Sequence, residues 1–111
     1  MSNLIADLSE ENGRWTLKLV GSIDSETHQL MWSAEGSTAL LEKLQVAQAD
    51  SLWIDLTEIE RFDSQGLRLL LNAHKEFSRA QLPIILKNPN AHLNRLFQIM
   101  QFDRIFTIEF E

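Results

Sequence analysis

The sequence contains no cysteine and no tyrosine, and only two prolines and four glycines among its 111 residues. Without cysteine, disulfide scaffolds, thiolate zinc sites and cysteine nucleophiles are excluded. The scarcity of proline and glycine argues against a loop-dominated chain. No apolar run approaches the roughly 18 residues that a membrane-spanning helix needs. The segment Met1–Asp7 has neither a basic region nor an apolar core, so we expect no signal peptide and a cytoplasmic location.

Basic residues are also in short supply, because ten Lys and Arg stand against sixteen Asp and Glu and leave a net charge of −6. Such a chain is not expected to bind nucleic acid or an anionic membrane surface non-specifically. Residues 1–63 hold twelve acids and four bases, whereas residues 64–111 hold four acids and six bases. The length and a hydrophobic fraction of 44% predict one globular domain over residues 1–111.

The first half of the chain has the pattern of a hairpin followed by a helical region. Short alternating runs at 4–9 and 14–20 flank Asn12-Gly13, and Asn-Gly is the strongest short signal for an antiparallel β-hairpin. Residues from about 26 to 48 have helical apolar spacing, but Gly36 interrupts it. We therefore expect a kink, or a short helix before the main one.

The second half alternates strands and helices. A compact apolar strand at 52–56 and a polar loop at 57–63 precede an amphipathic helix that runs to about residue 80. A strand at 82–87, a third helix and a closing strand at 106–110 follow. The apolar stripe expected on the third helix consists of Leu93, Leu96, Phe97 and Met100. This order predicts an α/β fold with a mostly parallel sheet, an N-terminal antiparallel hairpin and three to four helices.

Chemistry-bearing residues concentrate where the segment Asp63-Ser64-Gln65-Gly66-Leu67 opens the second main helix. Ser64 is expected at or beside the N-cap, where a hydroxyl can cap the helix and a phosphate is stabilised by the helix dipole. Gly66 would let another surface approach the backbone closely. A serine hydrolase elbow needs Gly-x-Ser-x-Gly, but Phe62 occupies the first position, so we expect no enzyme. From spacing alone, a simple helix cap remains open.

The run from Leu52 through Asp63-Ser64-Gln65-Gly66-Leu67 resembles the signature of the STAS domain, a family named after sulphate transporters and anti-sigma factor antagonists. Gly21-Ser22-Ile23-Asp24 is similar to the Gly-x-x-Asp that follows the family's second strand. The resemblance implies an anti-sigma factor antagonist of a bacterial partner-switching pathway. In such proteins an anti-sigma factor that is also a serine kinase phosphorylates the matching serine, here Ser64, and a serine phosphatase reverses the modification. The unphosphorylated form binds the anti-sigma factor and frees the sigma factor for transcription.

The resemblance implies a docking surface and no cofactor or metal. Its expected members surround the phosphorylation site: Asp24, Asp63, Ser64, Gln65, Gly66, Leu67 and Arg68. The stretch 55–63 holds four acids against one base, so we expect a negative rim around Ser64. Adding a phosphate there would repel a docked partner. We expect a monomer or weak dimer, without nucleic acid binding or membrane insertion.

The sequence departs from the family pattern at several positions and leaves two rival functions open. Gln65 stands where a small residue is usual, the segment 29–36 is longer than usual, and glycine is missing both from 79–83 and from 101–103. Trp32 is either core or a partner anchor, while Trp15 and Trp53 are expected to be mostly core and His74 a boundary residue. The rival functions are a STAS subunit of a membrane transport complex of the ABC lipid-transport type, without phospho-switching, and a sensor of a small ligand.

Overall fold

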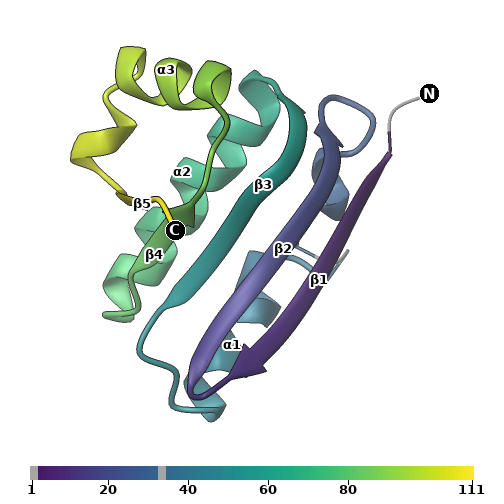
Figure 1. Ribbon diagram of the computed structural model, residues 1–111. Coiled ribbons are helices and arrows are strands. Elements are labelled where there is room, and N and C mark those ends of the chain that lie inside the picture. Colours follow the sequence, from purple (N-terminus) through teal and green to yellow (C-terminus); the bar gives the residue numbers. More distant parts are fainter. Residues whose placement is uncertain (1–2, 33–34) are drawn as a thin grey trace.

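The computed structural model describes residues 3–32 and 35–111. Along the chain the elements are β1 (Leu4–Glu11), β2 (Arg14–Ile23), the 3₁₀ turn η1 (His28–Leu30), α1 (Ser37–Val46), β3 (Leu52–Phe62), α2 (Ser64–Arg79), β4 (Ile84–Lys87), α3 (Ala91–Ile99), η2 (Phe102–Arg104) and β5 (Thr107–Glu109). The strands form one sheet in the order β1-β2-β3-β4-β5 (Figure 1). Only β1 and β2 are antiparallel, so the predicted α/β fold is confirmed.

The hairpin between β1 and β2 follows from its turn residues. Asn12 and Gly13 both have positive φ angles, 54° and 85°, which suits a two-residue turn between twisted strands. The strands extend further than their alternating pattern indicates, because pairing continues from Glu11↔Arg14 to Leu4↔Gly21.

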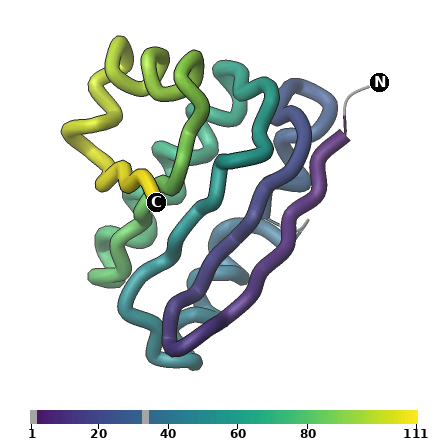
Figure 2. The backbone as a smooth tube through the Cα atoms, viewed as in Figure 1, coloured from purple at the N-terminus to yellow at the C-terminus, as the bar shows by residue number. Residues whose placement is uncertain are grey.

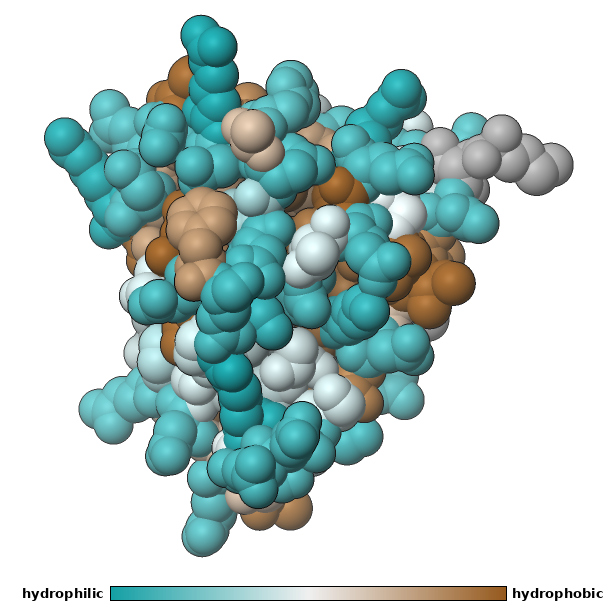
Figure 3. Space-filling view, viewed as in Figure 1, coloured by the Kyte–Doolittle hydropathy of each residue, from teal (hydrophilic) through white to brown (hydrophobic). Residues whose placement is uncertain are grey.

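One face of the sheet carries the core and the other lies open. Every parallel connection steps to the next strand in the same direction, so right-handed crossovers place the helices on one face. Figures 1 and 2 show α1 and α2 behind the strands. Leu17, Ile54 and Leu86 point toward this helical layer and are fully buried. The opposite face, seen in Figure 3, is largely covered by hydrophilic side chains.

The predicted polar loop at 57–63 is wrong, because β3 continues to Phe62. Its second half pairs with the end of β2, where Gly21 lies opposite Ile59 and Ile23 opposite Phe62. The register shift between Gly21 and Ser22 in this pairing allows Ile59 and Phe62 to be buried although they are three residues apart. A strict two-residue alternation cannot represent such a strand.

The segment between β2 and β3 contains a short helix and a main one, as expected from the interruption at Gly36. Gly36 precedes α1 with φ of 98°. Trp32 is only 5% exposed and belongs to the core, so the partner-anchor interpretation of Trp32 is wrong. Residues 33 and 34 of the longer segment lie outside the described residues.

The other two tryptophans are only half-buried. Trp53 faces the open side of the sheet, where the Arg14 guanidinium lies 3.4 Å over its ring. The expectation that Trp15 and Trp53 are mostly core therefore overstated their burial.

The C-terminal part follows the prediction with one difference. Leu93 and Phe97 are buried on α3, but Met100 lies beyond the helix and is 46% exposed, so it does not belong to the stripe. Gln81 and Gln101 adopt φ angles of 59° and 60° in the two segments from which glycine is missing. The chain thus makes both left-handed turns without the residue that favours them.

Candidate functional site at the start of α2

Asp63, not Ser64, caps α2. The Asp63 Oδ1 atom accepts hydrogen bonds from the backbone N–H groups of Gln65 and Gly66 at 3.0 and 3.3 Å. Ser64 is the first helical residue and is exposed, and its hydroxyl has no hydrogen bond within residues 3–32 and 35–111. The interpretation of Ser64 as the cap is wrong, whereas its position beside the cap is confirmed. Ser64 is therefore exposed, and its hydroxyl contributes no hydrogen bond to the part of the fold that the structure describes.

Gly66 and Leu67 pack the first turn of α2 against the core. A Cβ on Gly66 would collide with the Ile23 Cγ2 methyl and would lie 2.8 Å from Cε1 of Phe62. The glycine is needed because α2 approaches the ends of β2 and β3 closely. Leu67 is 6% exposed and belongs to the core. Neither residue offers a side chain to a partner.

Asp24 organises the turn that follows β2. Its Oδ1 atom accepts hydrogen bonds from the N–H groups of Glu26 and Thr27 at 2.9 and 3.2 Å. Thr27 is 3% exposed, and its hydroxyl donates to the Ser22 carbonyl at 2.6 Å. Thr27 was not recognised in the sequence, although Asp-x-x-Thr is a local signal for such a turn.

A backbone hydrogen bond joins the turn after β2 to the start of α2. The Asp63 N–H donates to the carbonyl of Ile23 at 2.9 Å, which places Asp24 next to the start of α2. Parallel strands β2 and β3 bring their carboxyl ends to the same edge of the sheet, where open α/β sheets carry their sites. The exposed or half-exposed residues at this edge include Asp24, Asp63, Ser64, Gln65 and Arg68.

The negative rim is smaller than the sequence count indicates. Because β3 is extended, Asp55 lies eight residues and roughly 25 Å from Asp63, well beyond the screening length of about 8 Å in physiological salt. Glu58 is paired with Lys18 at 2.7 Å. The acids that remain near the start of α2 are Asp63, the exposed Glu60 three residues before it, and Asp24 in the turn after β2.

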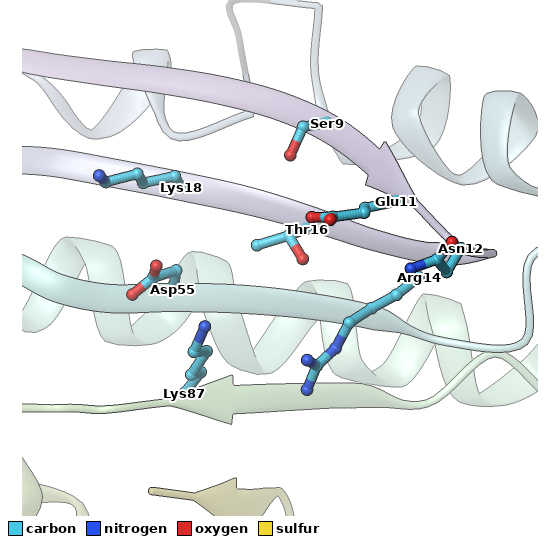
Figure 4. A pocket seen from close by; sticks show the side chains of 8 residues that line it. All are labelled: Ser9, Glu11, Asn12, Arg14, Thr16, Lys18, Asp55 and Lys87. Carbon is cyan, nitrogen blue, oxygen red and sulfur yellow. The ribbon is translucent and has the colours of Figure 1, made fainter. Parts of the chain in front are cut away.

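A separate hollow of about 630 Å³ lies on the open face, toward the hairpin end of the sheet (Figure 4). Ser9 and Glu11 of β1, Arg14, Thr16 and Lys18 of β2, Asp55 of β3 and Lys87 of β4 line it together with Asn12. Its cations have acidic neighbours, since Arg14 and Lys87 each contact the Glu111 carboxylate at 3.1 Å. Hydrogen bonds from Lys87 and then Arg14 lower the pKa of Glu111. This hollow lies at the other end of β2 from Ile23 and Ser64.

Among residues 3–32 and 35–111, no group of three or more His, Asp and Glu side chains could hold a metal ion. No helix in the same residues is both long enough and apolar enough to cross a membrane.

Comparison with known proteins gives consistent results. A family model described as Mlab, STAS domain matches residues 6–108. The chain is 33% identical over 91 residues to proteins named anti-sigma-B factor antagonist from Listeria monocytogenes and Listeria innocua. Each alignment covers 82% of this chain and 75% of the relative.

Solved structures share the fold at lower identity. An anti-sigma factor antagonist from Mycobacterium paratuberculosis superposes with a TM-score of 0.70 at 16% identity, covering 95% of this chain and 84% of that one. The unphosphorylated form of the anti-sigma factor antagonist SpoIIAA gives 0.64 at 18% identity, covering 95% and 88%. SpoIIAA of Bacillus in its phosphorylated form gives 0.63 at 18%, covering 95% and 91%.

Proposed function

Because this chain belongs to the STAS domain family, we propose that it is an anti-sigma factor antagonist that switches partners through Ser64. With a free hydroxyl at Ser64 it binds an anti-sigma factor that is also a serine kinase. The kinase transfers the γ-phosphoryl group of ATP to the Ser64 oxygen, which loses its proton, ADP leaves, and the partner then dissociates. A serine phosphatase hydrolyses the ester to serine and inorganic phosphate. In this proposal the chain is a kinase substrate in the bacterial cytoplasm, not an enzyme.

The observation that carries the proposal is the division of labour between Asp63 and Ser64. Asp63 accepts the hydrogen bonds that cap α2, so a modified Ser64 costs the helix no cap. Ser64 is exposed in the first turn, where a negative charge is favourable for the helix. Phosphorylation can therefore act on the surface alone, without refolding the domain.

Phosphorylation of Ser64 would make the surface around it much more negative. A phosphate adds about −1.5 to −2 at neutral pH beside Asp63 and Asp24. A partner docked over this corner would face added repulsion and the cost of desolvating the phosphate. Like-charge contacts at an interface cost several kcal/mol, and about 1.4 kcal/mol already weakens binding tenfold. Release by direct disruption of the interface is sufficient.

Capture from the native lysate with phosphosite mass spectrometry would test this function. We expect the chain to retain an anti-sigma factor with a kinase domain and to carry phosphate on Ser64 in the unbound fraction. In direct binding, Ser64→Ala should bind the captured partner like the wild type, whereas Ser64→Asp should bind at least tenfold more weakly. Ser9→Asp adds the same charge at an exposed site on β1 and should leave binding unchanged. Equal binding by Ser64→Asp and the wild type would refute the switch.

A second function is favoured by one observation, namely that the matching family model is described as Mlab, STAS domain and not as an antagonist. In that case the chain is a docking subunit of a membrane transport complex and needs no phosphorylation. Capture of a transport ATPase, together with the absence of Ser64 phosphate under all growth conditions, would identify this function.

A further inference from the structure

Arg68 lies one helical turn after Ser64 on α2. Residues four apart on a helix are neighbours on its surface, with Cβ atoms about 5–6 Å apart. Both side chains are exposed, and Gly66 and Leu67 between them face the core. Arg68 makes no ion pair with any residue in 3–32 or 35–111. Within the described part of the chain, a cation without an ion pair therefore lies one helical turn from Ser64.

The helix terminus itself has few donors left for a phosphate. Asp63 Oδ1 already takes the N–H groups of Gln65 and Gly66, and the Leu67 N–H donates to the Asp63 carbonyl. A phosphoryl group on Ser64 would have to compete with the neighbouring carboxylate for these donors. Its remaining source of compensating charge on α2 is the guanidinium four residues on.

We infer that Arg68 is a positioning residue that holds the phosphoryl group of phosphorylated Ser64 against the first turn of α2. This inference rests on the proposed function, since it assumes that Ser64 is the modified residue. An acid that precedes a cation by four residues is the favoured order on a helix, and the planar guanidinium can donate two parallel hydrogen bonds to phosphate oxygens. Arg68 would stabilise the dianion over the monoanion.

Pairing of Arg68 with the phosphate would also increase the difference in partner affinity between the unmodified and the phosphorylated protein. Before modification the surface offers a partner two acids, Asp24 and Asp63, together with the Arg68 cation. After modification the phosphate adds negative charge and the cation is occupied by it. A partner that uses an acidic group to contact Arg68 would lose that contact as well as meeting the phosphate.

The test uses the full chain with phosphoserine incorporated at position 64 during translation, so it does not depend on any kinase. Phosphorus NMR follows the second ionisation of the phosphate as a function of pH at low salt. In the Arg68→Gln variant the acid dissociation constant for this step should decrease about twofold or more relative to the wild-type sequence, as expected for loss of an i,i+4 ion pair. Arg68→Lys should retain part of the effect, and 1 M salt should remove it.

Two control variants separate a specific contact from general charge. Arg79→Gln removes the same charge from the last turn of α2, and Arg61→Gln removes it from an exposed site three residues before Ser64 on β3. Neither should change the dissociation constant as Arg68→Gln does. An unchanged constant in Arg68→Gln, or an equal change in all three variants, would overturn the inference. This measurement can succeed even if no anti-sigma factor binds, so its failure and that of the proposed function are distinguishable.

Discussion

Substituting Gly66 by alanine tests whether the close approach of α2 to the sheet is a property of the fold. In an unconstrained helix interior this change would stabilise the protein by up to about 1 kcal/mol. Here the new methyl would meet the fully buried Ile23 and would stand 2.8 and 3.0 Å from two ring carbons of Phe62. Carbon atoms pack at about 3.5–4.0 Å, so α2 or the Phe62 ring must move by roughly 1 Å.

The movement is expensive because Phe62 is itself held in place by an edge-on contact with the Phe97 ring, at 6.1 Å between centroids. Overpacking of this kind costs about 1–3 kcal/mol, and we expect a net loss of about 1 kcal/mol after the gain in helix propensity is subtracted. With an m value of about 1.5 kcal/mol/M, the urea midpoint followed by tryptophan fluorescence should decrease by about 0.7 M.

The neighbouring exposed position provides the control, because Gln65→Ala should change the stability by less than about 0.5 kcal/mol. In an Ile23→Ala background the methyl on residue 66 enters vacated space, so Gly66→Ala should cost much less there. If Gly66→Ala alone is as stable as the wild type, the close contact at this corner does not exist as described.

Three further predictions concern single residues. Asp63→Ala should lower the free energy of unfolding by about 1 kcal/mol through loss of the α2 cap, whereas Ser64→Ala should lower it by less than about 0.5 kcal/mol. If thermal denaturation gave the reverse order, the assignment of the cap to Asp63 would be contradicted. Burial lowers the pKa of His74, whose ring lies against Phe106, so the unfolded chain takes up the proton first as pH falls below the ordinary value of 6.5. Wild-type stability should therefore decline relative to His74→Asn from pH 7.5 toward pH 5, and parallel profiles would exclude this effect. Gln101→Gly should raise the free energy of unfolding by about 0.5–1 kcal/mol, measured as a higher urea midpoint. Residue 101 has φ of 60°, and glycine adopts that conformation at little cost. A lower midpoint would show that the Gln101 side chain stabilises the fold by more than its backbone strain destabilises it.

Much of the fold was predictable because its signals are local. The Asn12-Gly13 pair specifies the hairpin turn, and the spacing of Leu67, Leu70 and Phe77 specifies the buried side of α2. The alternation of strands and helices then permits few topologies, since parallel crossovers are right-handed. These features need only the order of residues along the chain.

Two of the incorrect predictions depended on contacts between distant segments. The residues at 57–62 look polar in sequence, but pairing with the end of β2 holds them in β3 and carries Asp55 away from Ser64. Trp32 lies in an irregular segment, and only its packing against the rest of the core shows that it is buried.

For the candidate site, the sequence by itself determined that an Asp-Ser-x-Gly-Leu segment begins a helix after a buried strand, because capping and amphipathic spacing are local properties. The tertiary structure decided which residue does what within that segment. Asp63 turns inward to cap the helix, Gly66 is required by the nearness of Ile23 and Phe62, and Ser64 is left exposed beside Arg68. The requirement for glycine at position 66 follows from how closely α2 approaches the ends of β2 and β3, a distance set by packing across the whole domain.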